Sequence, residues 1–91
     1  MNIQKIFTAL EEDADNSALG VVVAELESQG YGVAVEGRRV NAVDIFDGSH
    51  ADLENRIGPL SIALYKGEAL EQEFAVEFTD YHYAVFRQSV K

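Results

Sequence analysis

The stretch LSIALYKGEALEQEFAVEF, residues 60–78, decides the fold that this sequence predicts. Large apolar residues fill every second position near both of its ends: Leu60, Ile62 and Leu64, then Phe74, Val76 and Phe78. A period of two is typical of a β-strand that buries one side. We expect two antiparallel strands with both apolar rows on the same side of the sheet. This arrangement requires an odd loop of three or five residues within Gly67–Glu71, and it places Ile62 opposite Val76.

A third strand continues the pattern after a tight turn at residues 80–81. We expect Tyr83 to lie opposite Phe78 and Val85 opposite Val76, because directly paired residues of antiparallel strands share a face. Residues 60–88 are therefore predicted to form a three-stranded meander.

A β-hairpin is predicted over residues 31–46. Valines alternate with small residues in its first half, and Gly37-Arg38 suits a two-residue type II′ turn, which has glycine first. That turn would pair Val35 with Val40.

Two short helices are predicted at the N-terminus. Each has an apolar stripe at the i, i+3, i+4, i+7 spacing of one helix face: Ile3, Ile6, Phe7 and Leu10, then Leu19, Val22, Val23 and Leu26. In one continuous helix the two stripes would point about 160° apart, so we expect a break near Asp13–Asn16. Asn16 or Ser17 would then cap the second helix, and Gly30 would end it.

A short helical turn over residues 50–57 connects the hairpin to the meander, because Ser49 and Asp52 have the spacing of a capping box. Together these elements predict an α+β fold, with two short N-terminal helices packed on one face of an antiparallel sheet of about five strands. The length of 91 residues fits a single globular domain over residues 1–91.

The composition excludes several classes of function. Cysteine is absent, which excludes disulfides, thiolate metal ligands and a cysteine nucleophile. Sixteen acidic residues against seven basic ones give a net charge of −9, which argues against direct binding to nucleic acid. The sequence has neither a signal peptide nor an apolar run long enough to span a membrane, so we expect a cytoplasmic protein without membrane contact.

The side chains that could carry catalysis are not arranged in a recognisable constellation. None of the serines lies in a G-x-S-x-G elbow. Glu73 and Glu77 lie four residues apart on one strand, roughly 13 Å, which is too far to share a proton. We therefore expect no enzyme, no cofactor and no resident metal ion.

A metal-dependent protein remains an alternative, because both histidines have carboxylate neighbours. His50 lies between Asp47 and Asp52, and His82 follows Asp80. The competing interpretation makes His50 a surface residue at a helix start and His82 a half-exposed strand residue.

The second face of the predicted meander is the candidate binding surface. Its floor would consist of small residues, Ala63, Ala75 and Ala84, and its margin would consist of Tyr65, Glu73, Glu77, His82 and Phe86. Apolar floors with aromatic and charged margins are typical of protein–protein contact surfaces. The alternatives are a partly solvated sheet face and a face covered by the segment of Leu53 and Ile57.

Two functional hypotheses follow. The first is a small acidic, non-catalytic protein-interaction module that uses this face, with another protein or a second copy as partner. The second is an acidic inhibitor or nucleic-acid mimic that occupies a basic groove on a partner protein. Its motive is the charge distribution: seven acids and one base give −6 in residues 1–37, and nine acids and six bases give −3 in residues 38–91.

Overall fold

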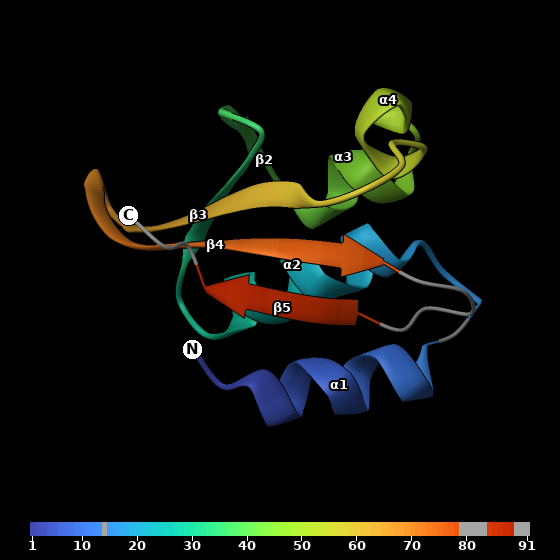
Figure 1. Ribbon diagram of the computed structural model, residues 1–91, viewed down its shortest axis with the longest axis horizontal. Coiled ribbons are helices and arrows are strands. Elements are labelled where there is room, and N and C mark those ends of the chain that lie inside the picture. Colours follow the sequence, from blue (N-terminus) through green and yellow to red (C-terminus); the bar gives the residue numbers. More distant parts are fainter. Residues whose placement is uncertain (14, 79–83, 89–91) are drawn as a thin grey trace.

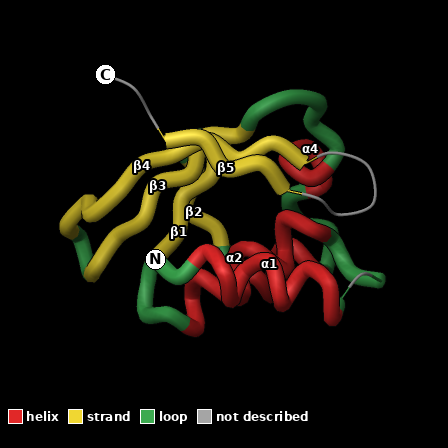
Figure 2. The backbone as a smooth tube through the Cα atoms, turned by 60° about the horizontal axis from the view of Figure 1, so that its bottom comes forward, coloured by secondary structure: helices red, strands yellow, loops and turns green. Residues whose placement is uncertain are grey.

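The computed structural model describes residues 1–13, 15–78 and 84–88, the last of these as backbone only. Four helices and five strands follow one another in this part of the chain (Figure 1): α1 Ile3–Glu12, α2 Ala18–Ser28, β1 Gly32–Val35, β2 Arg38–Val40, α3 Ala42–Phe46, α4 Ala51–Glu54, β3 Leu60–Lys66, β4 Ala69–Phe78 and β5 Ala84–Gln88. The strands form one antiparallel sheet in the order β2-β1-β3-β4-β5. Figure 2 shows α1 and α2 side by side against one side of this sheet, as the sequence predicts.

The pairing of β3 with β4 confirms that the two apolar rows share a face, but the loop between the strands is shorter than predicted. Leu60 pairs with Val76 and Ile62 with Phe74, two residues away from the predicted register. The strands are joined by a two-residue turn, and the register shifts between Leu64 and Tyr65. This bulge adds one residue to β4, which is why an even turn still leaves both apolar rows on one side.

The predicted register of the last strand is wrong by one residue. Val76 pairs with Phe86 and Phe78 with Ala84, whereas the sequence pattern placed Val85 opposite Val76. A shift of one residue exchanges the two faces of a strand. The predicted turn at residues 80–81 and the predicted partner Tyr83 lie outside the described residues.

The first hairpin turns one residue earlier than predicted. Glu36 and Gly37 both have positive φ angles, 52° and 79°, which is the geometry of a type I′ turn. Val35 consequently pairs with Arg38, and Val33 pairs with Val40.

The prediction that the hairpin extends to residue 46 is also wrong, because residues 42–46 form α3. The Asn41 side chain accepts a hydrogen bond from the Asp44 backbone N–H at 2.9 Å and so caps this helix. Ala42 and Ile45 lie one turn apart and are both buried. The apolar residues of this segment therefore follow helical spacing.

The predicted helix ends agree with the structure at α1 and α2. Ser17 caps α2 by accepting a hydrogen bond from the Gly20 backbone N–H at 3.3 Å, and Gly30 follows the helix with a φ of 93°. At α4 the predicted capping box is absent, because the Ser49 hydroxyl donates to Asp47 instead. The N-cap residue is His50, whose side chain makes no capping hydrogen bond, and the helix covers only Ala51–Glu54 of the predicted residues 50–57.

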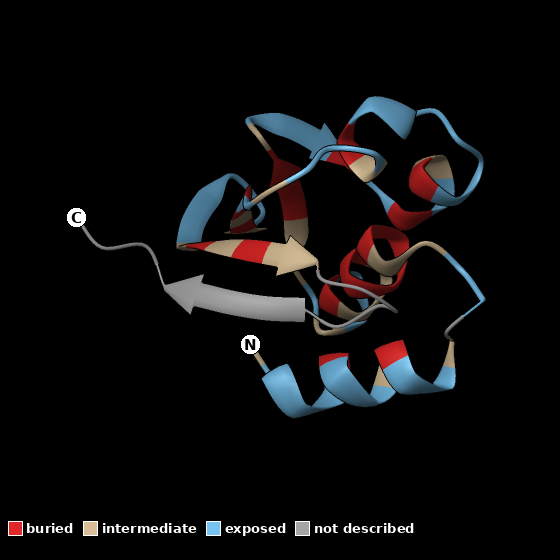
Figure 3. Cartoon of the chain, turned by 45° about the vertical axis from the view of Figure 1, so that its right-hand side comes forward, coloured by how far each residue is buried: buried red, intermediate tan, exposed pale blue. Residues whose placement is uncertain are grey.

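The hydrophobic core lies between the sheet and the helices (Figure 3). It draws fully buried side chains from β1, β3, β4, α1, α2 and α3: Val33, Val35, Leu60, Ile62, Leu64, Val76, Ile6, Val22, Val23, Leu26 and Ile45. One side of the sheet therefore packs against the helices, and the described residues on its other side alternate with these core residues along β3 and β4.

The turn geometry generates a stability prediction. Replacing Gly37 by alanine should lower the free energy of unfolding by about 1 kcal/mol, because a Cβ disfavours the left-handed backbone region. Gly37→Asn is the matched control and should cost less, since asparagine tolerates this region. Urea unfolding measures both variants, and equal losses for alanine and asparagine would contradict the turn assignment.

Candidate functional site

The side of the sheet that faces away from α1 and α2, here the outer face, carries a row of small residues between two charged ones. Direct strand pairing aligns Arg39 with Ala34, Ala34 with Ala63, and Ala63 with Glu73, across β2, β1, β3 and β4. Ala34 is only 4% exposed although it is not part of the core cluster. This outer-face row therefore has a low centre and opposite charges at its two ends.

An aromatic contact borders this row. The Arg39 guanidinium lies over the Tyr65 ring, 4.7 Å from its centroid. Gly32 pairs with Tyr65, and a Cβ on Gly32 would lie 2.6 Å from Arg39 Nη2. Glycine at this position therefore leaves room for the arginine to reach the ring.

Five of the residues predicted to form the binding surface share the outer face. They alternate with the core residues of β3 and β4: Ala63, Tyr65, Glu73, Ala75 and Glu77. All five are half-buried. The structure adds two residues from neighbouring strands that the sequence pattern did not include, Ala34 and Arg39, and a half-exposed Leu70 opposite Tyr65.

The remaining three predicted residues do not join this surface as described. Ala84 and Phe86 pair with the core-side positions Phe78 and Val76, so the prediction that they complete the alanine floor is wrong. The one-residue error in the register of β5 is the reason. His82 lies outside the described residues.

The segment of Leu53 and Ile57 does not cover the outer face. Leu53 belongs to the core cluster, on the helical side, and Ile57 is 99% exposed. The structure thus contradicts one of the two alternatives for this face, the one in which the segment of Leu53 and Ile57 covers it.

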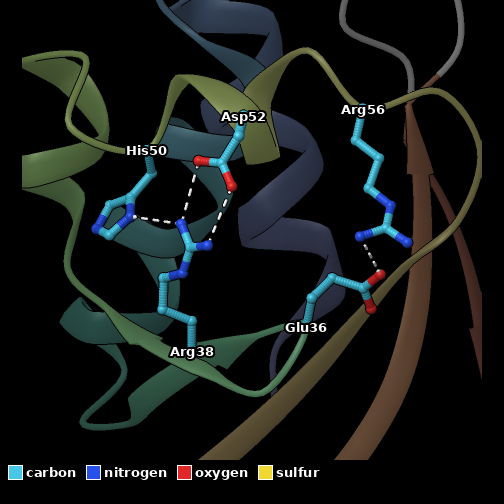
Figure 4. Close-up of polar contacts among 5 residues, drawn as sticks. All are labelled: Glu36, Arg38, His50, Asp52 and Arg56. Atoms are coloured by element: carbon cyan, nitrogen blue, oxygen red, sulfur yellow. Dashed lines mark hydrogen bonds and ion pairs between the residues drawn. The ribbon is translucent and has the colours of Figure 1, made fainter.

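The neighbourhood of His50 is an ion-pair network rather than an open ligand set (Figure 4). The two terminal nitrogens of the Arg38 guanidinium, Nη1 and Nη2, donate to the Asp52 carboxylate at 3.1 and 3.0 Å, and Nη1 also lies 3.4 Å from His50 Nδ1. A fixed cation therefore already occupies the space between the imidazole and the carboxylate. Within residues 1–13 and 15–78, no group of three or more histidine and carboxylate side chains is placed to hold a metal ion.

A second ion pair joins the hairpin turn to the chain before β3 (Figure 4). Arg56 Nη1 lies 2.9 Å from Glu36 Oε1, and Glu36 Oε2 accepts a hydrogen bond from the Ser61 backbone N–H at 3.0 Å. The hairpin is thus joined to residues 52–61 at two points, by Glu36 in its turn and by Arg38 directly after the turn.

These contacts shift the ionisation of the groups involved. Hydrogen bonding to Arg38 lowers the pKa of Asp52, and the same contact raises the pKa of Arg38. The pKa of Asp47 is lowered by hydrogen bonds from the hydroxyl and backbone N–H of Ser49. Each of these pKa shifts stabilises the charged form of its group, as expected of surface ion pairs and hydrogen-bonded turns.

Comparison of the chain with protein-family models, with curated proteins and with solved structures gave no match. In the part of the chain that the structure describes, each helix is too short or too polar to cross a lipid bilayer.

The ion pair generates a prediction about pH. In Arg38→Gln the pKa of Asp52 should rise towards its ordinary value, while in Arg39→Gln, the matched control on the neighbouring residue, it should stay low. Because the pKa is lowered on folding, the pair stabilises the protein above the pKa of unfolded Asp52, and this contribution is lost as pH falls through the folded pKa. NMR titration of the side-chain carboxyl carbons measures the pKa. An unchanged pKa of Asp52 in Arg38→Gln would refute the ion pair between Arg38 and Asp52.

Proposed function

We propose that this protein is a small, acidic, non-catalytic interaction module of the cytoplasm that associates with a second copy of itself through the outer face. The observation that carries the proposal is the outer-face row, Arg39, Ala34, Ala63 and Glu73, with a positive charge at one end and a negative charge at the other.

A two-fold axis parallel to the strands makes this row complementary to itself. Rotation about that axis turns the second sheet over and reverses its order of strands across the interface. Arg39 of each copy then faces Glu73 of the other copy, and the alanines of the two rows face each other. The contact is isologous, so the same ion pair forms twice.

The side-chain sizes suit such a contact. Two sheets that pack face to face lie about 10 Å apart, with the side chains of both faces filling the space between them. Ala34 and Ala63 face the same two alanines of the second copy, so no large side chain in the middle of the row keeps the two sheets apart. Tyr65 and the half-exposed Leu70 supply apolar surface beside the row.

A charge-swap series tests the proposal. Arg39→Glu alone and Glu73→Arg alone should each weaken dimerisation about tenfold or more, because each places like charges opposite one another. The double variant in one chain should restore dimerisation, since the reversed row is again complementary to itself. Sedimentation equilibrium measures the dimer dissociation constants.

Glu68→Arg is the control for net charge, because Glu68 is exposed in the turn between β3 and β4. It should leave the dimer unchanged. A monomeric parent protein at high concentration, or a double variant as weak as the single ones, would refute the proposed dimer.

A further inference from the structure

A groove runs along the helical side of the molecule, opposite the outer face. One hollow is lined by four apolar residues from three helices and by three acidic residues: Ala9, Val21, Ala24 and Phe46, with Glu12, Asp13 and Glu25. A second hollow shares Ala9, Glu12 and Glu25 with it and continues along α1 past Lys5 to Asn2. We call the two together the helix groove.

The floor of the groove follows from the composition of α2. Its sequence, ALGVVVAELES, is apolar on nearly every side. Val22, Val23 and Leu26 are fully buried in the core. Val21 and Ala24 line the groove, but Val21 is itself a core residue, only 4% exposed, and Ala24 is half-buried. A helix that is apolar all round normally has other elements against every side, as α2 largely does here. Ala9, Ala24 and Phe46 keep partial exposure and are the apolar surface that the groove offers to a partner.

The wall of the groove is an apolar side chain in contact with α2. A Cβ on Gly20 would lie 2.5 Å from Phe46 Cε1, which shows that the Phe46 ring lies directly against the helix backbone. Phe46 nevertheless remains 45% exposed, and Val43, three residues earlier on α3, is 74% exposed. Phe46 therefore packs against α2 and lines the groove while almost half of its surface stays exposed.

The acidic rim has no cationic partner within the described residues. The two ion pairs there belong to Arg38 and Arg56, and the two cations stacked on rings are Arg39 and Lys66. Asp13 is hydrogen-bonded to the Asn16 amide, and Glu25 to the Gln29 amide. Lys5 is the one basic residue in the lining, against Glu12, Asp13 and Glu25, so the groove keeps a net negative charge beside its apolar floor.

We propose that the helix groove binds a basic amphipathic helix of a partner protein. Apolar side chains at i, i+3, i+4 and i+7 of that helix would contact Ala9, Ala24 and Phe46, and its flanking lysines and arginines would pair with Glu12, Asp13 and Glu25. α1 has ten residues, about 15 Å of helix, so the groove accommodates about three turns. A second copy is disfavoured as the occupant, because its own groove would bring the same acids face to face.

A synthetic peptide tests this proposal. The probe is a helix of about four turns with a leucine stripe and flanking lysines, labelled for fluorescence anisotropy. It should bind the full-length protein, and rising salt should weaken the binding. The same peptide with glutamates in place of the lysines should not bind. Amide NMR shifts should be concentrated at Ala9, Ala24 and Phe46.

Two charge-matched double variants separate this groove from general attraction to an acidic protein. Glu12→Lys with Glu25→Lys should weaken peptide binding about tenfold or more, while Glu68→Lys with Glu71→Lys, in the exposed β3–β4 turn region, should change it less than about twofold. Circular dichroism and thermal unfolding establish that both variants are folded.

Equal losses in the two double variants, shifts centred on the sheet, or no binding of the lysine peptide would each overturn the proposal. The Arg39→Glu variant should bind the peptide as the parent does. Failure of the proposed dimer and failure of the proposed groove are therefore distinguishable, because they are measured on opposite sides of the molecule.

Discussion

The pairing of β3 with β4 is the constraint on which the rest of the structure depends. Because side chains alternate across a strand, the register that places Ile62 beside Phe74 also places Ala63 beside Glu73 on the opposite face. A slip by one residue would move the apolar row to water and the small residues to the core. The bulge opposite Leu64 and Tyr65 adds one residue to β4, so the apolar rows of β3 and β4 stay on one face although the turn between the strands has an even length. The same bulge therefore sets which residues of β4 lie in the core and which lie on the outer face.

The two sides of the molecule differ in charge. The described arginines other than Arg87 lie on the hairpin or on the chain that approaches β3, where two of them form ion pairs and a third stacks on Tyr65. The helices carry most of the acids of the N-terminal third and a single base, Lys5. The outer face is consequently mixed in charge and suited to a copy of itself, whereas the helix groove is lined by three acids and the single base Lys5 and is suited to a cationic partner. One small domain can in this way present two chemically distinct surfaces.

Much of the fold could be predicted because its main determinants are local. The apolar stripes of α1 and α2, the cap at Ser17 and the alternation in β3 and β4 are all properties of short segments. Two of the errors occurred where two local patterns compete. The pattern of residues 42–46 suits a strand as well as a helix, and the cap at Asn41 favours the helix. The hairpin turn lies at Glu36 and Gly37, one residue before the predicted position, because a type I′ turn with two positive φ angles fits the twist of the strands.

By itself the sequence determined the α+β class, the two N-terminal helices and which rows of β3 and β4 face the core, because hydrophobic periodicity reports burial directly. Only the tertiary structure decided the order of the strands, the register of β5 and the residues that complete each surface. Strand order and register depend on hydrogen bonds between distant segments, and no periodicity within one segment specifies them. For the same reason Ala34, Arg39 and Phe46 became candidates only when β1, β2 and α3 were placed beside their neighbours.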